Sequence, residues 1–306
     1  MGNKNVFKQI WDYRMMIKGL IHRDLRGRYK GSVLGFFWTF LNPLLQLVVY
    51  TILFGILLKS NIPDFYLYLF IGLIPWIFMS TCVSGGAGCI LEQKSLVTKV
   101  RFPREVIPIS YATTAFINML FTFIVIFAVL GVQMTINSVK AGVGFPVNPE
   151  FFSPENQQLI QSGVKTALEI GNETRFNFLP LLSLPLVFLI EYMLGLGMTF
   201  LCSTITVYLR DMQHILGIVT MLWCYCTPIM YSLKNILSPE QYDKYYSIFL
   251  YANPMTSIIE AYHDILYTGT WPNFLNLLVG LGYAVVFLVV GFLVFEKGKR
   301  RFAEEM

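Results

Sequence analysis

Long runs without charge dominate this chain of 306 residues. Five stretches carry no charged side chain at all, and a sixth contains only Glu191. A helix that crosses a bilayer needs about 20 predominantly apolar residues, which each stretch provides or closely approaches. The six stretches are residues 33–58, 65–91, 106–136, 176–209, 215–233 and 271–295. The pattern therefore predicts an all-α polytopic membrane protein with six transmembrane helices.

Composition excludes the main alternatives. Charged residues make up 13% of the chain and hydrophobic residues 55%, whereas soluble domains have about 25% and about 45–50%. A disordered chain would need high charge and few aromatic residues. The net charge is +5, but the basic residues flank the apolar runs instead of gathering on one polar face, so we expect no nucleic-acid partner.

The distribution of Lys and Arg predicts the orientation. With six spans and both termini in the cytoplasm, 17 basic residues lie inside and six outside, as the positive-inside rule requires. A seventh apolar stretch, residues 245–259, has 15 uncharged residues and contains Asn253-Pro254. It is too short to cross, and a seventh span would move the basic tail outside. We therefore expect a re-entrant helical segment before the last span.

These elements divide the chain into seven parts. We expect a cytoplasmic amphipathic interface helix at 1–32, spans one to three at 33–136 with a cytoplasmic loop at 92–105, and an extracytoplasmic insert at 137–175. Spans four and five follow at 176–233, a re-entrant segment at 234–270, the last span at 271–295 and a cytoplasmic tail at 296–306.

Two cytoplasmic segments each admit two roles. Apolar residues recur at helical spacing from Val6 to Ile21, which predicts a helix lying in the membrane interface. This helix either anchors the chain to lipid or also docks a soluble partner. The loop 92–105 is short, basic and ends at Pro103-Arg104-Glu105. It is either an ordinary basic loop or a lever that a cytoplasmic motor pushes.

Signatures of chemistry are sparse. The sequence has no phosphate-binding G-x-x-x-x-G-K-[ST] loop and no H-E-x-x-H or G-x-S-x-G motif, so we expect no cofactor or metal in this chain. The glycine-rich run 84–88 sits inside a span, where close packing or a helix irregularity is the expected role. An intramembrane lipid-modifying enzyme remains the alternative from a different class.

Four ionisable residues are the exceptions. Glu191 either faces a water-filled cavity or pairs with hydroxyl groups between helices, since a carboxylate inside a span is a functional hypothesis by default. Glu260, His263 and Asp264 cluster in the re-entrant segment. We expect them to line its polar outer mouth, with acid–base chemistry as the alternative.

Several short segments together resemble the membrane subunits of ABC exporters for lipid-linked polysaccharides, a family that moves O-antigen, capsule and wall teichoic acid precursors. The segments occur in the family's order over nearly the whole chain. They are residues 28–35, 37–38, 41–44, 99–105, 107–108, 208–211, 227–231, 253–255, 259–262 and 295–304.

The resemblance implies a homodimer in a bacterial cytoplasmic membrane, bound to two copies of a separate ATPase that uses ATP and Mg. The cargo would be a polysaccharide or teichoic-acid-type polymer on a polyprenyl diphosphate, and the chain itself would catalyse no reaction. An exporter of a small amphiphile, drug or lipid is the alternative within the same class. The insert 137–175 departs from shorter members of the family.

The resemblance also implies functional residues. The ATPase-coupling segment comprises Gln93, Lys94, Ser95, Leu96, Val97, Lys99, Arg101, Phe102 and Arg104. We expect the lipid diphosphate to enter near the basic residues Arg26, Arg28 and Lys30. The glycan path candidates are side chains with flat rings, which stack on sugars, and two carboxylates: Phe37, Trp38, Tyr50, Trp76, Phe78, Glu191, Trp223, Tyr225, Tyr231 and Glu260. Aromatic residues in spans also serve as packing or belt residues, and this second role stays open.

Overall fold

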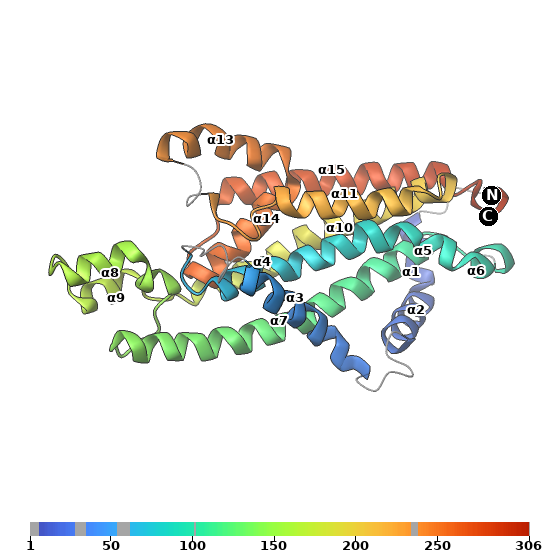
Figure 1. Cartoon of the computed structure of the whole chain (residues 1–306). Helices are drawn as coiled ribbons and strands as arrows, with labels where there is room; N and C mark the ends of the chain where they lie inside the picture. The colour runs from blue at the N-terminus through green and yellow to red at the C-terminus, as the bar shows by residue number, and fades with distance from the viewer. Residues whose placement is uncertain (1–5, 28–34, 54–61, 101, 234–237, 306) are drawn as a thin grey trace.

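The computed structural model describes residues 6–27, 35–53, 62–100, 102–233 and 238–305. Within these ranges the regular structure is helical, apart from one isolated antiparallel bridge between Val147 and Arg175. The helices form an elongated bundle (Figure 1). The predicted all-α fold is therefore confirmed.

Four continuous helical segments are long and apolar enough to cross a membrane. The first, Phe65–Glu92, consists of α4 (Phe65–Ser80), the π-helical turn η3 (Thr81–Gly85) and α5 (Gly86–Glu92). The others are α7 (Val106–Ala141), the 3₁₀ turn η5 (Leu179–Ser183) with α10 (Leu184–Tyr208), and α15 (Phe274–Gly298).

The two remaining predicted spans correspond to shorter apolar helices. The 3₁₀ turn η1 (Gly35–Phe37) leads into α3 (Trp38–Tyr50), and residues 54–61 of the predicted first span lie outside the described residues. The helix α11 (Met212–Cys226) has 15 residues and ends where Thr227 becomes extended before Pro228. Four helical segments of the described chain are thus candidate membrane spans, and the count of six stays a prediction.

The helix α7 is longer than a membrane is thick. Its 36 residues correspond to about 54 Å at 1.5 Å per residue, compared with a hydrocarbon core of about 30 Å. Gly142, with a φ of 67°, ends the helix in a left-handed conformation. The predicted start of the polar insert at residue 137 therefore falls inside α7.

Small residues allow the long helices to approach closely. The glycine-rich run 84–88 begins inside the π-helical turn η3 and continues into α5, and a Cβ atom at Gly86 would lie 3.0 Å from Cγ2 of Thr199. The expectation of close packing or a helix irregularity there is therefore confirmed. Where α10 meets α15, a Cβ atom at Gly197 would lie 2.5 Å from the backbone nitrogen of Leu288.

The two ends of the bundle differ in what they carry. The short helices α1 (Val6–Asp12), α2 (Arg14–Gly27) and α6 (Lys94–Lys99) lie at the end where the chain also terminates (Figure 1). The insert helices α8 (Pro154–Gln161) and α9 (Ala167–Glu173) lie at the opposite end.

The segment predicted to be re-entrant is a broken helix. It comprises α13 (Pro239–Ala252) and α14 (Pro254–His263), and α14 continues into the π-helical turn η6 (Asp264–Thr268). The break falls at Asn253-Pro254 because proline cannot continue the preceding helix. The side chain of Asn253 caps α14 by accepting a hydrogen bond from the backbone N–H of Met255 at 3.0 Å.

Candidate functional site

The loop between the first two long spans turns sharply and exposes a basic face. The chain bends at Gln93, between α5 and α6. On α6, Lys94, Ser95 and Lys99 are exposed, whereas Val97 is buried. The short helix therefore has one apolar anchor beneath a polar outer surface.

The anchor rests on a core that the tail of the chain completes. Val97 belongs to a cluster of buried apolar side chains from α5, α7, α10 and α15, and Phe102 packs against it. Phe302 of α16 (Phe302–Glu305) lies in the same cluster and is fully buried. We call α6, residues 102–105 and tail residues 296–302 the loop–tail cluster.

Polar contacts join the two halves of the loop–tail cluster. The ammonium group of Lys299 donates hydrogen bonds to the carboxylates of Glu105 and Glu296. Arg104 donates to the backbone carbonyl of Lys299, and its guanidinium carbon lies 6.0 Å from the ring centre of Phe302. The loop and the tail therefore form one unit.

This network shifts the pKa values of Glu105 and Lys299. Burial raises the pKa of the Glu105 carboxyl above its ordinary value of 4.5. Burial alone would lower the pKa of Lys299, but its hydrogen bonds to Glu105 and Glu296 outweigh this effect and raise the pKa. Of the predicted coupling residues, Arg101 lies outside the described residues.

The residues predicted to meet the lipid diphosphate are only partly visible. Arg26 is exposed in the last turn of α2, and residues 28 and 30 lie outside the described residues. A cavity of about 610 Å³ lies between α2, α7 and the start of the loop. Its lining includes Arg23, which forms an ion pair with Asp24 at 2.9 Å, but not Arg26.

The aromatic path candidates differ in how deeply they are buried within the described chain. Trp76 and Phe78 are buried. The ring of Trp223 meets Trp76 edge to face at 5.4 Å, and its indole N–H donates to Asn253 at 2.8 Å. These three side chains pack within the bundle, and their place along a glycan path stays a prediction.

The other aromatic candidates lie nearer the surface. Phe37 and Tyr225 are exposed, and Trp38, Tyr50 and Tyr231 are half-buried. The hydroxyl of Tyr231 donates to the backbone carbonyl of Tyr225 at 3.1 Å. The exposed rings of this group are the ones that another molecule can reach.

Glu191 is fully buried between helices. The hydroxyl of Tyr262 on α14 donates a hydrogen bond to its carboxylate, and both residues have an exposed fraction of 0%. Of the two roles left open by the sequence, the structure supports pairing with a hydroxyl. The contact joins α14 to α10.

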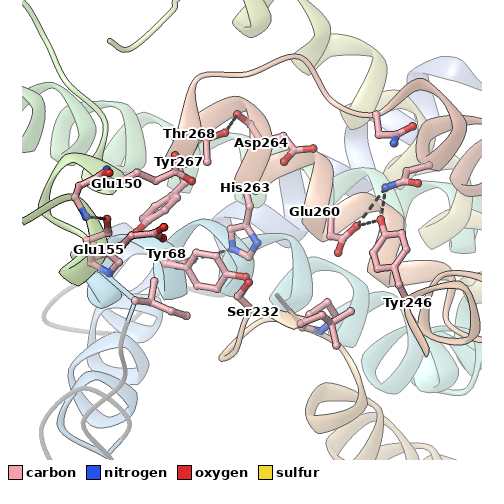
Figure 2. A pocket seen from close by; sticks show the side chains of 18 of the residues that line it. Tyr68, Glu150, Glu155, Ser232, Tyr246, Glu260, His263, Asp264, Tyr267 and Thr268 are labelled. Atoms are coloured by element: carbon pink, nitrogen blue, oxygen red, sulfur yellow. Dashed lines mark hydrogen bonds between the residues drawn. The ribbon is translucent and has the colours of Figure 1, made fainter. Parts of the chain in front are cut away.

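A larger cavity, of about 860 Å³, lies where the insert meets α14. We call it the insert-side cavity. Figure 2 shows Glu150 and Glu155 on one side of it, Tyr68 and His263 in the middle and Glu260 with Tyr246 on the other side. The expectation that Glu260, His263 and Asp264 line a polar mouth agrees with this geometry.

Two local networks shape the wall of this cavity. The rings of Tyr68 and His263 stack with centres 3.7 Å apart, and Nε2 of His263 lies 3.0 Å from the carbonyl oxygen of Tyr68. The carboxylate of Glu260 accepts hydrogen bonds from the Tyr246 hydroxyl and from the Asn276 amide, the latter at 3.2 Å. These contacts hold the His263 ring and the Glu260 carboxylate in place.

Sequence reasoning missed several of these residues. Glu105 and Lys299 are 194 positions apart, and Glu150 is far from His263 along the chain. The basic tail 296–306 and the acidic residues of the insert are visible signals, but nothing in the sequence pairs either of them with a partner.

Long apolar helices, a basic loop resting on the tail, and a broken helix before the last span define a multi-pass membrane protein. The family model for ABC-2 type transporters matches residues 16–154 and 157–267. The chain belongs to this family, as a membrane subunit whose ATPase is a separate protein.

Named relatives agree with this assignment. The chain is 33% identical, over 98% of both chains, to the O-antigen export system permease protein RfbA of Myxococcus xanthus. It is 28% identical to the protein of the same name from Klebsiella pneumoniae, over 93% of this chain and 92% of that one. The polysialic acid transport protein KpsM of Escherichia coli is 25% identical, over 90% and 89%.

Proposed function

We propose that this chain is the membrane subunit of an ATP-driven exporter that moves a polyprenyl-diphosphate-linked polysaccharide or teichoic-acid-type polymer across the bacterial cytoplasmic membrane. The observation that carries the proposal is the relationship to an O-antigen export permease over 98% of both chains. The long apolar helices and the buried anchor of the basic loop support it.

The proposed topology has six crossings with both termini in the cytoplasm. Helices α3 and α11 supply the two crossings that are shorter than the others. The common location of α1, α2, α6 and the tail at one end of the bundle supports placing all of them on one side (Figure 1). In this topology the insert 137–175 lies on the extracytoplasmic side of the membrane.

The loop–tail cluster is the proposed contact with the ATPase. The exposed face of α6, with Lys94, Ser95 and Lys99, can enter a groove on the ATPase. Val97 on the other face is buried in the core, so it transmits a movement of α6 to the helices around it. A push on α6 reaches α10 and α15 through Phe200 and Phe295, which pack in the same cluster. Packed side chains transmit such movement because protein interiors are dense.

The proposed path runs between two copies of the chain. Apolar side chains on α3 and α11 are exposed, among them Val49, Ile218 and Leu222, together with Tyr225. A homodimer would bury such an apolar face. Aromatic rings that remain accessible along the dimer interface can stack on the sugar units of the polymer. The basic residues Arg26, Arg28 and Lys30 lie where the interface helix joins the first span in the sequence, and we propose that they attract the diphosphate of the lipid carrier.

Depletion of the protein in its host tests the proposal. Surface polymer should fall, and a lipid-linked form should accumulate on the cytoplasmic face, as measured by sugar and phosphate analysis of each membrane side. Unchanged surface polymer would refute the proposal. Stimulation of the partner ATPase by small amphiphiles would then become the relevant assay.

A further inference from the structure

The insert-side cavity has the size and the chemistry of a binding site. Its volume of about 860 Å³ falls in the range of roughly 300–1,000 Å³ that is typical of small-ligand sites. Segments far apart in the chain build it: the insert around Pro154, the end of α14 at His263, and Asn276 near the start of α15. The cavity therefore exists only in the folded chain and requires the insert.

The insert is held against the rest of the cavity by a specific contact. The amide of Asn148 donates to the backbone carbonyl of Thr268 in η6 at 3.0 Å, while its carbonyl oxygen accepts from the backbone N–H of Glu150 at 3.1 Å. One side chain thus ties the backbone of Glu150 to η6. This bond positions the insert's carboxylates at the cavity.

Carboxylates are distributed around the wall instead of converging on one point. Glu150 and Glu155 come from the insert, and Glu260 and Asp264 come from α14 and η6. Among the residues that the structure describes, no group of three His, Cys, Asp or Glu side chains has the arrangement of a metal site. Figure 2 shows Glu150 and Glu260 on opposite sides of the cavity. Such spacing suits an extended ligand with many hydrogen-bond donors.

The remaining wall suits a sugar. Tyr68, Tyr246 and Tyr267 contribute rings and hydroxyls, and Asn273 and Asn276 contribute amides. Carboxylates accept strong hydrogen bonds from hydroxyl groups, and aromatic rings cover apolar faces. A pyranose presents both kinds of surface.

The charge of the wall separates one class of sugar from another. Of the described residues that line the cavity, none is Lys or Arg. A phosphate or carboxylate on the ligand would face like charges, which disfavour binding, whereas hydroxyl and ammonium groups would be attracted. We infer that the insert-side cavity binds uncharged or amine-bearing sugar units of the exported polymer and discriminates against units that carry phosphate or carboxylate. This inference rests on the proposed function and narrows its cargo.

Direct binding to the purified permease–ATPase complex in lipid nanodiscs tests the inference. The probes are mannotetraose, which is neutral, the tetramer of glucosamine, which bears amines, and the tetramer of sialic acid, which bears carboxylates. The first two should bind at least about tenfold more tightly than the third, equivalent to about 1.4 kcal/mol. Equal or tighter binding of the sialic acid tetramer, or binding of none of the three, overturns the inference.

A matched pair of variants assigns the selectivity to the cavity. The double substitution Glu150→Gln/Glu155→Gln keeps the shape and removes two negative charges, so the preference over the sialic acid tetramer should shrink by about tenfold. Glu173→Gln is the control, because Glu173 lies on the same insert, pairs with Lys165 at 2.7 Å and does not line the cavity. Unchanged selectivity in the double variant overturns the inference.

The depletion experiment separates this failure from failure of the proposed function. If surface polymer falls on depletion but the complex shows no charge selectivity, the exporter assignment stands and the cavity assignment is wrong. If surface polymer is unchanged, the proposed function itself is wrong, whatever the binding data show.

Discussion

Lys299 donates a hydrogen bond to Glu105, and this contact joins the C-terminal tail to the end of the loop that precedes α7. The side chain of Glu105 is 1% exposed and that of Lys299 is 24% exposed. A buried carboxylate needs a partner, because removing one member of such a pair leaves an uncompensated charge. The contact therefore couples the folding of the loop to that of the tail.

Lys299→Met should destabilise the protein by about 2–4 kcal/mol, since it leaves the Glu105 carboxylate buried without its cation. Glu105→Gln should cost less, and Glu105→Gln/Lys299→Met should resemble Glu105→Gln alone. Thermal unfolding of the detergent-solubilised variants measures how their stability losses rank. Lys297→Met serves as the control because Lys297 lies in the last turn of α15 outside this network. Additive effects in the double variant would argue against a direct coupling.

The same pair predicts a pH dependence. Burial raises the pKa of Glu105, so its contribution to stability is present below its ordinary pKa of 4.5 and is lost as the pH rises through the folded value. The pKa of Lys299 is also raised, so its contribution is present below its ordinary pKa of 10.5 and is lost as the pH rises through the folded value. In Lys299→Met the charged carboxylate has lost its cation. The difference in Tm from the unsubstituted chain should therefore be widest near neutral pH and shrink as the pH falls toward 4.5. A difference that stays constant between about pH 8 and about pH 5 would contradict this assignment.

The exposed lysines of α6 provide a test of the coupling surface. Lys94→Glu/Lys99→Glu reverses two exposed charges without touching the buried anchor Val97. Affinity for the ATPase should fall by about tenfold or more, because charge reversal at an interface creates repulsion. Co-purification with the ATPase measures the loss. Lys140→Glu, at an exposed site in the last turn of α7, is the control at the other end. Normal co-purification of the double variant would place the contact elsewhere.

Glycine packing between α10 and α15 predicts a position-specific effect. A Cβ atom at Gly291 would overlap the carbonyl oxygen of Gly197, whereas nothing lies within 4 Å of a Cβ atom at Gly282 on the same helix. Gly291→Ala should therefore destabilise the protein by about 1–3 kcal/mol through overpacking. Gly282→Ala should be neutral or should stabilise by up to about 1 kcal/mol through helix propensity. Thermal unfolding in detergent compares them, and equal Tm values would count against close packing of the two helices.

Hydropathy predicted the long helices well because an apolar run of about 20 residues without charge is characteristic of a membrane-spanning helix. It overestimated α11, since the apolar run continues to Leu233 while Pro228 prevents a helix from doing so. The break at Asn253-Pro254 was predictable for the same reason. The position of a proline in the sequence thus predicts where a helix ends.

The sites were less predictable than the helices. The outward face of α6 follows from its pattern, but the buried contacts of Glu105 with Lys299 and of Asn148 with Thr268 join distant segments. A single sequence carries no signal for such pairs, because either member would also be satisfied by water or by a neighbour. The sequence does not identify the partner of Glu191 for this reason, whereas the structure places Tyr262 beside it.

The pair of Glu191 and Tyr262 allows a structural role to be separated from a chemical one. Tyr262→Phe leaves the buried carboxyl without its donor and should cost about 1–3 kcal/mol. Glu191→Gln keeps an acceptor and should cost less, and Glu191→Leu/Tyr262→Phe should recover part of the loss, because both polar groups are then gone. Tyr251→Phe is the control, because Tyr251 is an exposed residue outside the Glu191–Tyr262 contact.

Hydrogen exchange of the α14 backbone is the informative measurement, since the bond joins α14 to α10. Faster exchange in Tyr262→Phe than in Glu191→Gln, with export falling in the same order, fits a contact that holds the broken helix against the bundle. Loss of export in Glu191→Gln with unchanged exchange would contradict it. The carboxyl group itself would then take part in transport, because the amide preserves the shape and one acceptor oxygen but cannot ionise.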